Sequence, residues 1–162
     1  MSFDRVGGAS PRGSSLERDE HHMYIRALKR LFGYAHVLLG LAVAGQFVAS
    51  PTYDVATSSD VWDAISFAMA VGTATALVIS LVRIREVGKL PDWRATTMLI
   101  AAACLFLLFF RLWLGWEVYD SEETPPWEIR LLLWYAIDVL FVIVSVTVGR
   151  YLLRTATSQA GG

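Results

Sequence analysis

The sequence predicts an all-α integral membrane protein in which four transmembrane helices form an antiparallel bundle. Hydrophobic residues make up 55% of the 162 residues and charged residues only 18%, an unusual balance for a soluble domain. The hydrophobic residues also gather into four blocks, each close to the ~20 residues with which a helix crosses a bilayer. Basic and acidic residues alternate between the segments that connect these blocks.

Turn-forming residues separate the four predicted spans. Pro51 follows the first span, Gly88 and Pro91 follow the second, and Pro125 and Pro126 precede the fourth. Because proline lacks a main-chain N–H, a regular helix is expected to end near these positions. The predicted spans cover residues 31–49, 61–82, 95–116 and 129–150.

The membrane domain is predicted at residues 16–154, between two tails. Residues 1–15 are rich in glycine and serine and are predicted to form a flexible cytoplasmic tail, while residues 155–162 form a short C-terminal tail. Ser14 and Glu17 have the spacing of a capping box, and no proline or glycine follows until residue 33. This pattern predicts a short amphipathic helix before the first span.

The connecting segments predict the orientation in the membrane. The basic residues lie before the first span, between the second and third, and after the fourth, whereas residues 50–63 and 117–128 contain acidic residues and no Lys or Arg. Because basic segments stay on the cytoplasmic side, both termini are expected in the cytoplasm and the acidic loops outside. The expected location is a prokaryotic cytoplasmic membrane.

A stripe of small residues runs through the second span. Small residues recur at every fourth position of this span, which places them on one face of a helix. In lipid, such a face lets helix main chains approach closely and predicts helix packing. The stripe consists of Ala64, Ala68, Gly72, Ala76 and Ser80.

Asp138 interrupts the apolar run of the fourth span near its middle. A carboxylate at the centre of a span costs roughly 2.5–3.5 kcal/mol on insertion scales, so another group must offset this cost. Arg111 of the third span is predicted at a similar depth, and an ion pair between the two would fix the register of the helices. The alternatives are that Asp138 lines a proton or ion path, or that it contacts another subunit.

His36 is the one histidine within a predicted span. A haem held between helices usually has two axial ligands, so His36 by itself cannot complete such a site. It could supply one ligand at a subunit interface or titrate as a switch. The other interpretation is a histidine that is hydrogen-bonded to a neighbouring helix.

Four aromatic residues are predicted near the depth of Asp138. Trp134 and Tyr135 of the fourth span, with Phe110 and Trp113 of the third, could line an apolar pocket for a quinone, a pigment or a lipid tail. The alternative is that these rings fill space between helices or face lipid.

The single cysteine, the net charge and the lack of known catalytic motifs argue against several classes of function. Cys104 is the single cysteine, so no internal disulfide or thiolate metal cluster is expected, and the net charge of −1 gives no reason to expect nucleic acid as a partner. No hydrolase, metalloprotease or phosphate-binding motif is present, so an enzyme is not expected, and no cofactor or metal is required by the sequence.

Three functions follow from these observations. The first is a non-catalytic accessory or structural subunit of a larger membrane complex, such as an electron-transport complex. The second is a small oligomeric channel or proton-coupled transporter that uses Asp138, and the third is a quinone- or haem-associated redox subunit that uses His36. The expected partners are the lipid bilayer and either other membrane subunits or further copies of the chain.

Overall fold

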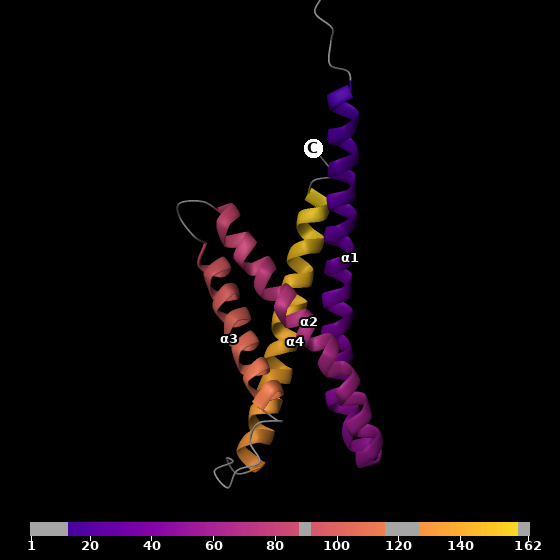
Figure 1. Cartoon of the computed structure of the whole chain (residues 1–162), viewed down its shortest axis with the longest axis vertical. Coiled ribbons are helices and arrows are strands. Elements are labelled where there is room, and N and C mark those ends of the chain that lie inside the picture. Colours follow the sequence, from indigo (N-terminus) through magenta and orange to yellow (C-terminus); the bar gives the residue numbers. More distant parts are fainter. Residues whose placement is uncertain (1–12, 88–91, 116–126, 159–162) are drawn as a thin grey trace, which may run out of the picture.

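The computed structural model describes residues 13–87, 92–115 and 127–158, which form four α-helices and one short 3-10 helix (Figure 1). Along the chain these elements are α1 (Gly13–Ala49), the 3-10 helix η1 (Ser50–Thr52), α2 (Val55–Val87), α3 (Trp93–Gly115) and α4 (Trp127–Ser158).

All four α-helices are long and apolar enough to cross a membrane, which confirms the predicted number of spans. The candidate spans cover Met23–Thr52, Thr57–Glu86, Trp93–Gly115 and Ile129–Ser158, and each overlaps one span predicted from the sequence. The described part of the chain is therefore all-helical and fits an integral membrane protein.

The helix bounds differ from the prediction in two places. The amphipathic helix predicted before the first span is not a separate element, because residues 13–49 form one continuous helix. Residues 16–32 contain neither proline nor glycine, so nothing interrupts the helical hydrogen bonds before the membrane segment begins. α4 continues to Ser158, beyond the predicted end of the span and into the predicted C-terminal tail. Residues 1–12, 159–162 and the capping-box side chains lie outside the described part.

Acidic residues cap two of the helices. The Asp54 carboxylate accepts hydrogen bonds from the main-chain N–H and the hydroxyl of Thr57, at 2.9 and 2.8 Å, at the start of α2. At the start of α3, Asp92 accepts a hydrogen bond from the Arg94 N–H at 3.3 Å. Each carboxylate satisfies a main-chain donor that has no partner inside the helix.

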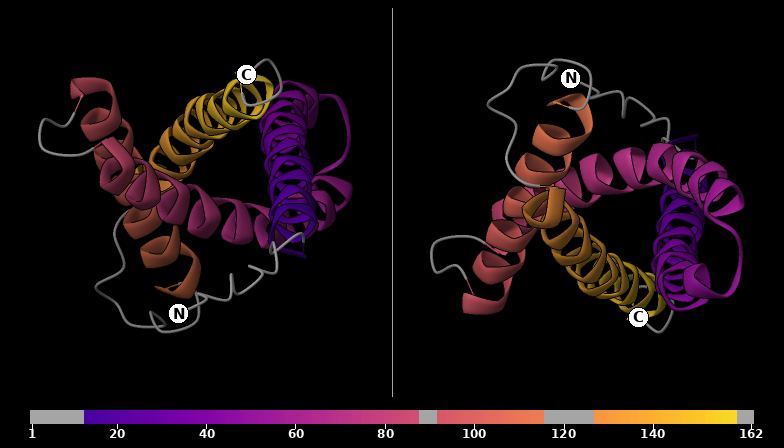
Figure 2. Two further views of the ribbon diagram at one scale, coloured as in Figure 1. Left: turned by 90° about the horizontal axis from the view of Figure 1, so that it is seen from above. Right: turned by 90° about the horizontal axis from the view of Figure 1, so that it is seen from below.

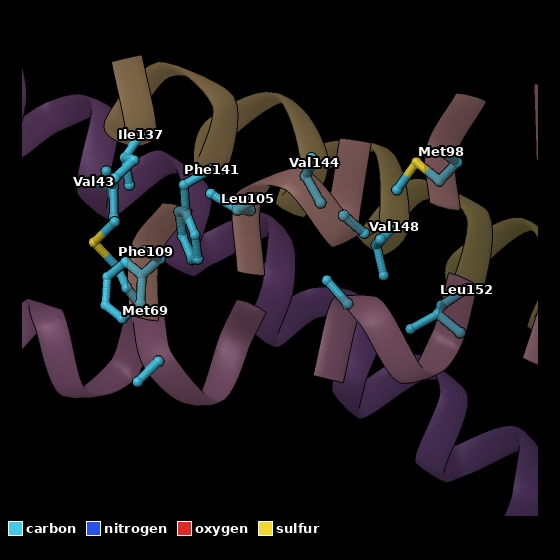
Figure 3. Close-up of a cluster of buried hydrophobic side chains, with 13 residues drawn as sticks. Val43, Met69, Met98, Leu105, Phe109, Ile137, Phe141, Val144, Val148 and Leu152 are labelled. Carbon is cyan, nitrogen blue, oxygen red and sulfur yellow. The ribbon is translucent and has the colours of Figure 1, made fainter. Parts of the chain in front are cut away.

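α2 and α4 each pack against all three other α-helices, and the most extensive contact is that of α4 with α1 (Figures 1 and 2). On α4 and α3 the buried side chains recur at intervals of three and four residues, which places them on one face of each helix. With Val43 of α1 and Met69 of α2 these side chains form one hydrophobic cluster. In Figure 3, Val43 and Met69 are at the end with Ile137 and Phe109, whereas Met98 and Leu152 are at the other end. On α3 the members of this cluster are Met98, Ala102, Leu105 and Phe109, and on α4 they are Ile137, Phe141, Val144, Val148 and Leu152.

α1 and α4 approach each other closely at glycines. A Cβ atom at Gly149 would lie only 2.6 Å from the main-chain oxygen of Gly33, and one at Gly40 would lie 3.4 Å from the Cβ of Ser145. Further along, the ring of Phe47 meets that of Tyr135 with centroids 5.4 Å apart. Residues later in α1 therefore contact residues earlier in α4.

The small-residue stripe of α2 is divided between two environments. Gly72, Ala76 and Ser80 are buried, whereas Ala64 and Ala68 are exposed. At Gly72 a Cβ atom would lie 3.0 Å from both Leu39 of α1 and Phe141 of α4. The half of the stripe near the end of α2 therefore packs against the other helices, and the first half remains open.

Replacing Gly149 tests the α1–α4 contact. In Gly149→Ala the new methyl group collides with the main chain of Gly33 and with Val37, whose Cγ2 lies 2.6 Å from the ideal Cβ position. Because main-chain atoms cannot move aside cheaply, overpacking should destabilise the protein by about 1–3 kcal/mol. The measurement is the thermal unfolding midpoint of the purified protein in mild detergent.

Gly45→Ala is the matched control, since a Cβ atom at Gly45 meets nothing within 4 Å. Its midpoint should equal or exceed that of the wild type, because alanine favours the helix more than glycine does. Equal midpoints for the two variants would show that the glycine contact does not stabilise the fold.

Candidate functional site

Asp138 is a buried carboxylic acid within the fourth candidate membrane span. Its side chain is 7% exposed, and it lies about 14 Å along the helix axis from Ile129, where the span begins. Two contacts of α4 with α1 flank it, the Phe47–Tyr135 ring pair on one side and the approach of Gly40 to Val142 on the other. The packing of α1 on α4 thus encloses this residue.

Arg111 is directed away from the bundle interior. It is exposed on α3, and its Nη1 atom lies 2.8 Å from the position that a Cβ of Gly115 would occupy. The guanidinium thus extends along α3 toward its C-terminal end, as long cationic side chains do when they reach for the membrane surface. Among the side chains that the structure describes, Arg111 and Asp138 form no ion pair.

His36 is a buried histidine with hydrogen bonds at both ring nitrogens. Its side chain is 3% exposed, and Nδ1 donates to the main-chain oxygen of Phe32 at 2.9 Å. Because that oxygen can only accept, Nε2 of the neutral ring is an acceptor, and it lies 3.1 Å from the hydroxyl oxygen of Thr75 on α2. Neither nitrogen is open to a metal or haem iron in this arrangement.

The Thr75 hydroxyl lies within hydrogen-bond distance of three acceptors, Nε2 of His36 and the main-chain oxygens of Val71 and Gly72. Besides Nε2 of His36, it lies 2.8 Å from the main-chain oxygen of Val71 and can donate its hydrogen to that oxygen. If the ring of His36 becomes doubly protonated, Nε2 can donate to Thr75 while Thr75 donates to Val71. This arrangement satisfies both charge states of the histidine without moving a helix.

Two further polar atoms are buried between the helices. Among the described side chains, Ser145 Oγ and Gln46 Nε2 are buried without a hydrogen-bond partner, although the Gln46 carbonyl oxygen accepts a hydrogen bond from Tyr53. Ser145 lies two helical turns after Asp138 on the same face of α4. The sequence interpretation missed Ser145, although its spacing of seven residues from Asp138 was a usable signal. Buried polar atoms of this kind usually have a water or an ion as partner.

The aromatic residues form two separate groups. Phe109 meets Trp113 and Trp134 with ring centroids 5.8 and 6.0 Å apart, and Phe110 meets Trp113 at 5.8 Å. Tyr135 instead packs on Phe47 of α1. Trp113 of α3 and Trp134 of α4 therefore both pack on the ring of Phe109, whereas Tyr135 belongs to the other group and packs on α1.

At one end of the molecule, Arg83 of α2 contacts both α4 and the residue that precedes α3. The Arg83 guanidinium lies 4.4 Å from the ring centroid of Tyr151 on α4, and its Nη2 atom is 4.0 Å from the carboxylate of Asp92 before α3. We call this end, where Arg30, Arg94, Arg150 and Arg154 also lie, the basic end. Within the described residues, no group of three or more His, Cys, Asp or Glu side chains is arranged to hold a metal ion.

No family model, no curated protein and no solved structure matches this chain.

Thr75→Val tests the polar contact between α1 and α2. The substitution leaves Nε2 of the buried His36 without its partner, which should lower the free energy of unfolding by about 1–3 kcal/mol. Thr75→Ser keeps the hydroxyl and should restore most of the loss. Thermal unfolding in mild detergent measures both effects.

Thr147→Val is the control, because the Thr147 hydroxyl is exposed and donates only to the main-chain oxygen of Ile143 within its own helix, at 2.7 Å. Its unfolding midpoint should stay close to that of the wild type. A loss as large as that of Thr75→Val would mean that the contact with His36 contributes nothing specific.

Proposed function

We propose that the four helices form an antiparallel bundle in a prokaryotic cytoplasmic membrane, with both termini and the basic end in the cytoplasm. The contacts of α1 with α4 run in opposite order along the two helices, which supports antiparallel packing of this pair. Two contacts of α2 with α3, Phe67 with Trp113 and Arg83 with Asp92, support the same for the second pair. The orientation follows from the basic residues at one end.

Within this bundle, we propose that Asp138 carries a proton for transport across the membrane. The observation that carries the proposal is a carboxyl group enclosed by α1 and α4 inside a membrane span, while Arg111 of α3 extends along its own helix toward Gly115. A buried carboxylate must be offset by a cation or neutralised by a proton. Binding and releasing one proton is the chemistry that such a group offers.

Two other polar groups support a path for that proton. Ser145 lies about 10 Å from Asp138 along α4 toward the basic end, and its hydroxyl is buried without a described partner. His36 lies between Gly33 and Gly40, which pack opposite Gly149 and Ser145, so the His36–Thr75 pair is nearer still to the basic end. In the proposed path, waters bound at Ser145 connect the histidine with the carboxyl group. The Thr75 hydroxyl can keep a hydrogen bond to either the ring of His36 or the main chain of its own helix.

Asp138→Asn tests the proposal. The amide keeps the shape of the side chain but cannot exchange a proton at neutral pH, so proton flux into vesicles containing the purified protein should fall to the rate of protein-free vesicles. Flux is measured with a pH-sensitive dye trapped inside the vesicles under an imposed potential. Asp63→Asn, at an exposed position of α2, should leave the flux unchanged.

A correctly folded Asp138→Asn protein with wild-type flux would exclude the proposed role. Its elution volume and unfolding midpoint in detergent establish whether the fold is retained. Asp138→Glu is a second variant, since it keeps a titratable carboxyl group and should retain part of the flux even where the amide is inactive.

A non-catalytic accessory subunit of a larger membrane complex is the second candidate. It is favoured by small residues that remain exposed along the helices, namely Gly45 of α1 and Ala64 and Ala68 of α2, where a partner helix could approach closely. Extraction from the native membrane in mild detergent, followed by mass spectrometry, should then recover a stoichiometric partner. Ala68→Leu should reduce that recovery, whereas recovery of the chain alone would argue against this candidate.

A redox role at His36 gains no support from the geometry, because hydrogen bonds occupy both ring nitrogens. An optical spectrum of the gently extracted protein is the direct test for a bound chromophore.

A further inference from the structure

The glycine contact between α1 and α4 gathers three arginines at the basic end. Arg30 precedes Gly33 by one helical turn, Arg150 follows Gly149 directly, and Arg154 follows Leu153, whose Cγ lies 2.8 Å from the ideal Cβ position of Gly33. All three arginines are exposed. Figures 1 and 2 show the last turns of α4 lying beside α1 at this level.

The three arginines lie on the same face of the α1–α4 pair. On α1 the buried side is formed by His36, which contacts α2, and on α4 by Val144 and Val148, which belong to the core with α2 and α3. Since α2 packs on this side of α1, and α2 and α3 pack on this side of α4, the exposed residues beside the glycine contact face the opposite way. We call that exposed side the outer face of the pair.

Exposed apolar residues continue the outer face toward the middle of the membrane. They follow the arginines at intervals of four and seven residues, which keeps them on one side of each helix. These residues are Tyr34 and Leu41 on α1 after Arg30, and Ile143 and Val139 on α4 before Arg150. The outer face is therefore cationic at the basic end and apolar beyond it.

No acidic residue lies near these arginines along their own helices. Residues 26–34 and 146–158 contain no Asp or Glu. The nearest described acidic residue on α1 is Glu20, about 15 Å before Arg30 along the helix axis. The positive charge of this face is therefore not neutralised by a carboxylate from a neighbouring turn of α1 or α4.

We propose that the outer face of the α1–α4 pair binds an anionic phospholipid, whose phosphate contacts Arg30, Arg150 and Arg154 and whose acyl chain follows the apolar strip. Guanidinium groups bind phosphate oxygens through paired charge-assisted hydrogen bonds, and basic residues beside membrane spans attract anionic lipids. The acyl chain matches Leu41, Ile143 and Val139 in chemistry. This site is separate from Asp138, so it does not depend on the proposed proton transport.

Native mass spectrometry of the purified protein with added phosphatidylglycerol or phosphatidylcholine tests the proposal. The wild type should retain phosphatidylglycerol more strongly than phosphatidylcholine. The double variant Arg150→Gln with Arg154→Gln should bind phosphatidylglycerol about tenfold more weakly, because each basic residue at the surface contributes to attraction of the headgroup. Arg30→Gln alone should also weaken binding, since α1 supplies one of the three arginines.

The control is the double variant Arg85→Gln with Arg94→Gln, which removes the same charge from exposed positions of α2 and α3 at the same end. Its preference for phosphatidylglycerol should remain at the wild-type level. An equal loss in both double variants would overturn the proposal in favour of unspecific surface charge. Unchanged binding in Arg30→Gln would equally overturn a site shared by the two helices, and unfolding midpoints of all variants verify that each is folded.

Discussion

The main-chain contact between Gly33 and Gly149 is the constraint on which the rest of the structure depends. A side chain at either position would push α1 and α4 apart, since an ideal Cβ at Gly149 lies 2.6 Å from a main-chain oxygen. In a bilayer the lipid tails are as apolar as leucine, so burial alone does not drive helices together. Close van der Waals contact at glycines supplies that attraction, and α2 and α3 then pack on one side of the pair.

The packing of α1 against α4 determines which residues surround Asp138 and Ser145. Ser145 lies against Gly40, and Asp138 lies between the contacts made by Phe47 and Gly40. On the other side of α4, Phe141 and the remaining core residues exclude water. The carboxyl group is therefore enclosed by apolar helices, while the cation nearest in predicted depth, Arg111, extends toward Gly115. A group kept in such a place at an energetic cost is a reasonable centre for function.

The close contact of α1 and α4 at Gly33 and Gly149 also separates the polar groups inside the bundle from the outer face of the pair. The residues of the proposed proton path lie away from the outer face. Ser145 faces Gly40 of α1, Asp138 is on the same face of α4 as Ser145, and His36 faces α2. The outer face holds exposed arginines at the basic end and exposed aliphatic side chains beyond them. Proton transfer inside the bundle and lipid binding on the outer face would thus use different parts of one helix pair. At the basic end, Arg83 connects α2 with Tyr151 of α4 and with Asp92 before α3.

The number of spans, their approximate bounds and the presence of Asp138 within one of them could be predicted from the sequence, because they depend only on the length and composition of apolar runs. Only the tertiary structure distinguished Gly149, which touches Gly33, from Gly45, which touches nothing within 4 Å. The tertiary structure also places Tyr135 on Phe47 and Trp134 on Phe109, although the two residues are adjacent in sequence. It leaves Ala64 and Ala68 of the α2 stripe exposed. The physical reason is that a membrane helix is apolar on every side, so the pattern of hydrophobic residues does not mark the face that a neighbouring helix covers.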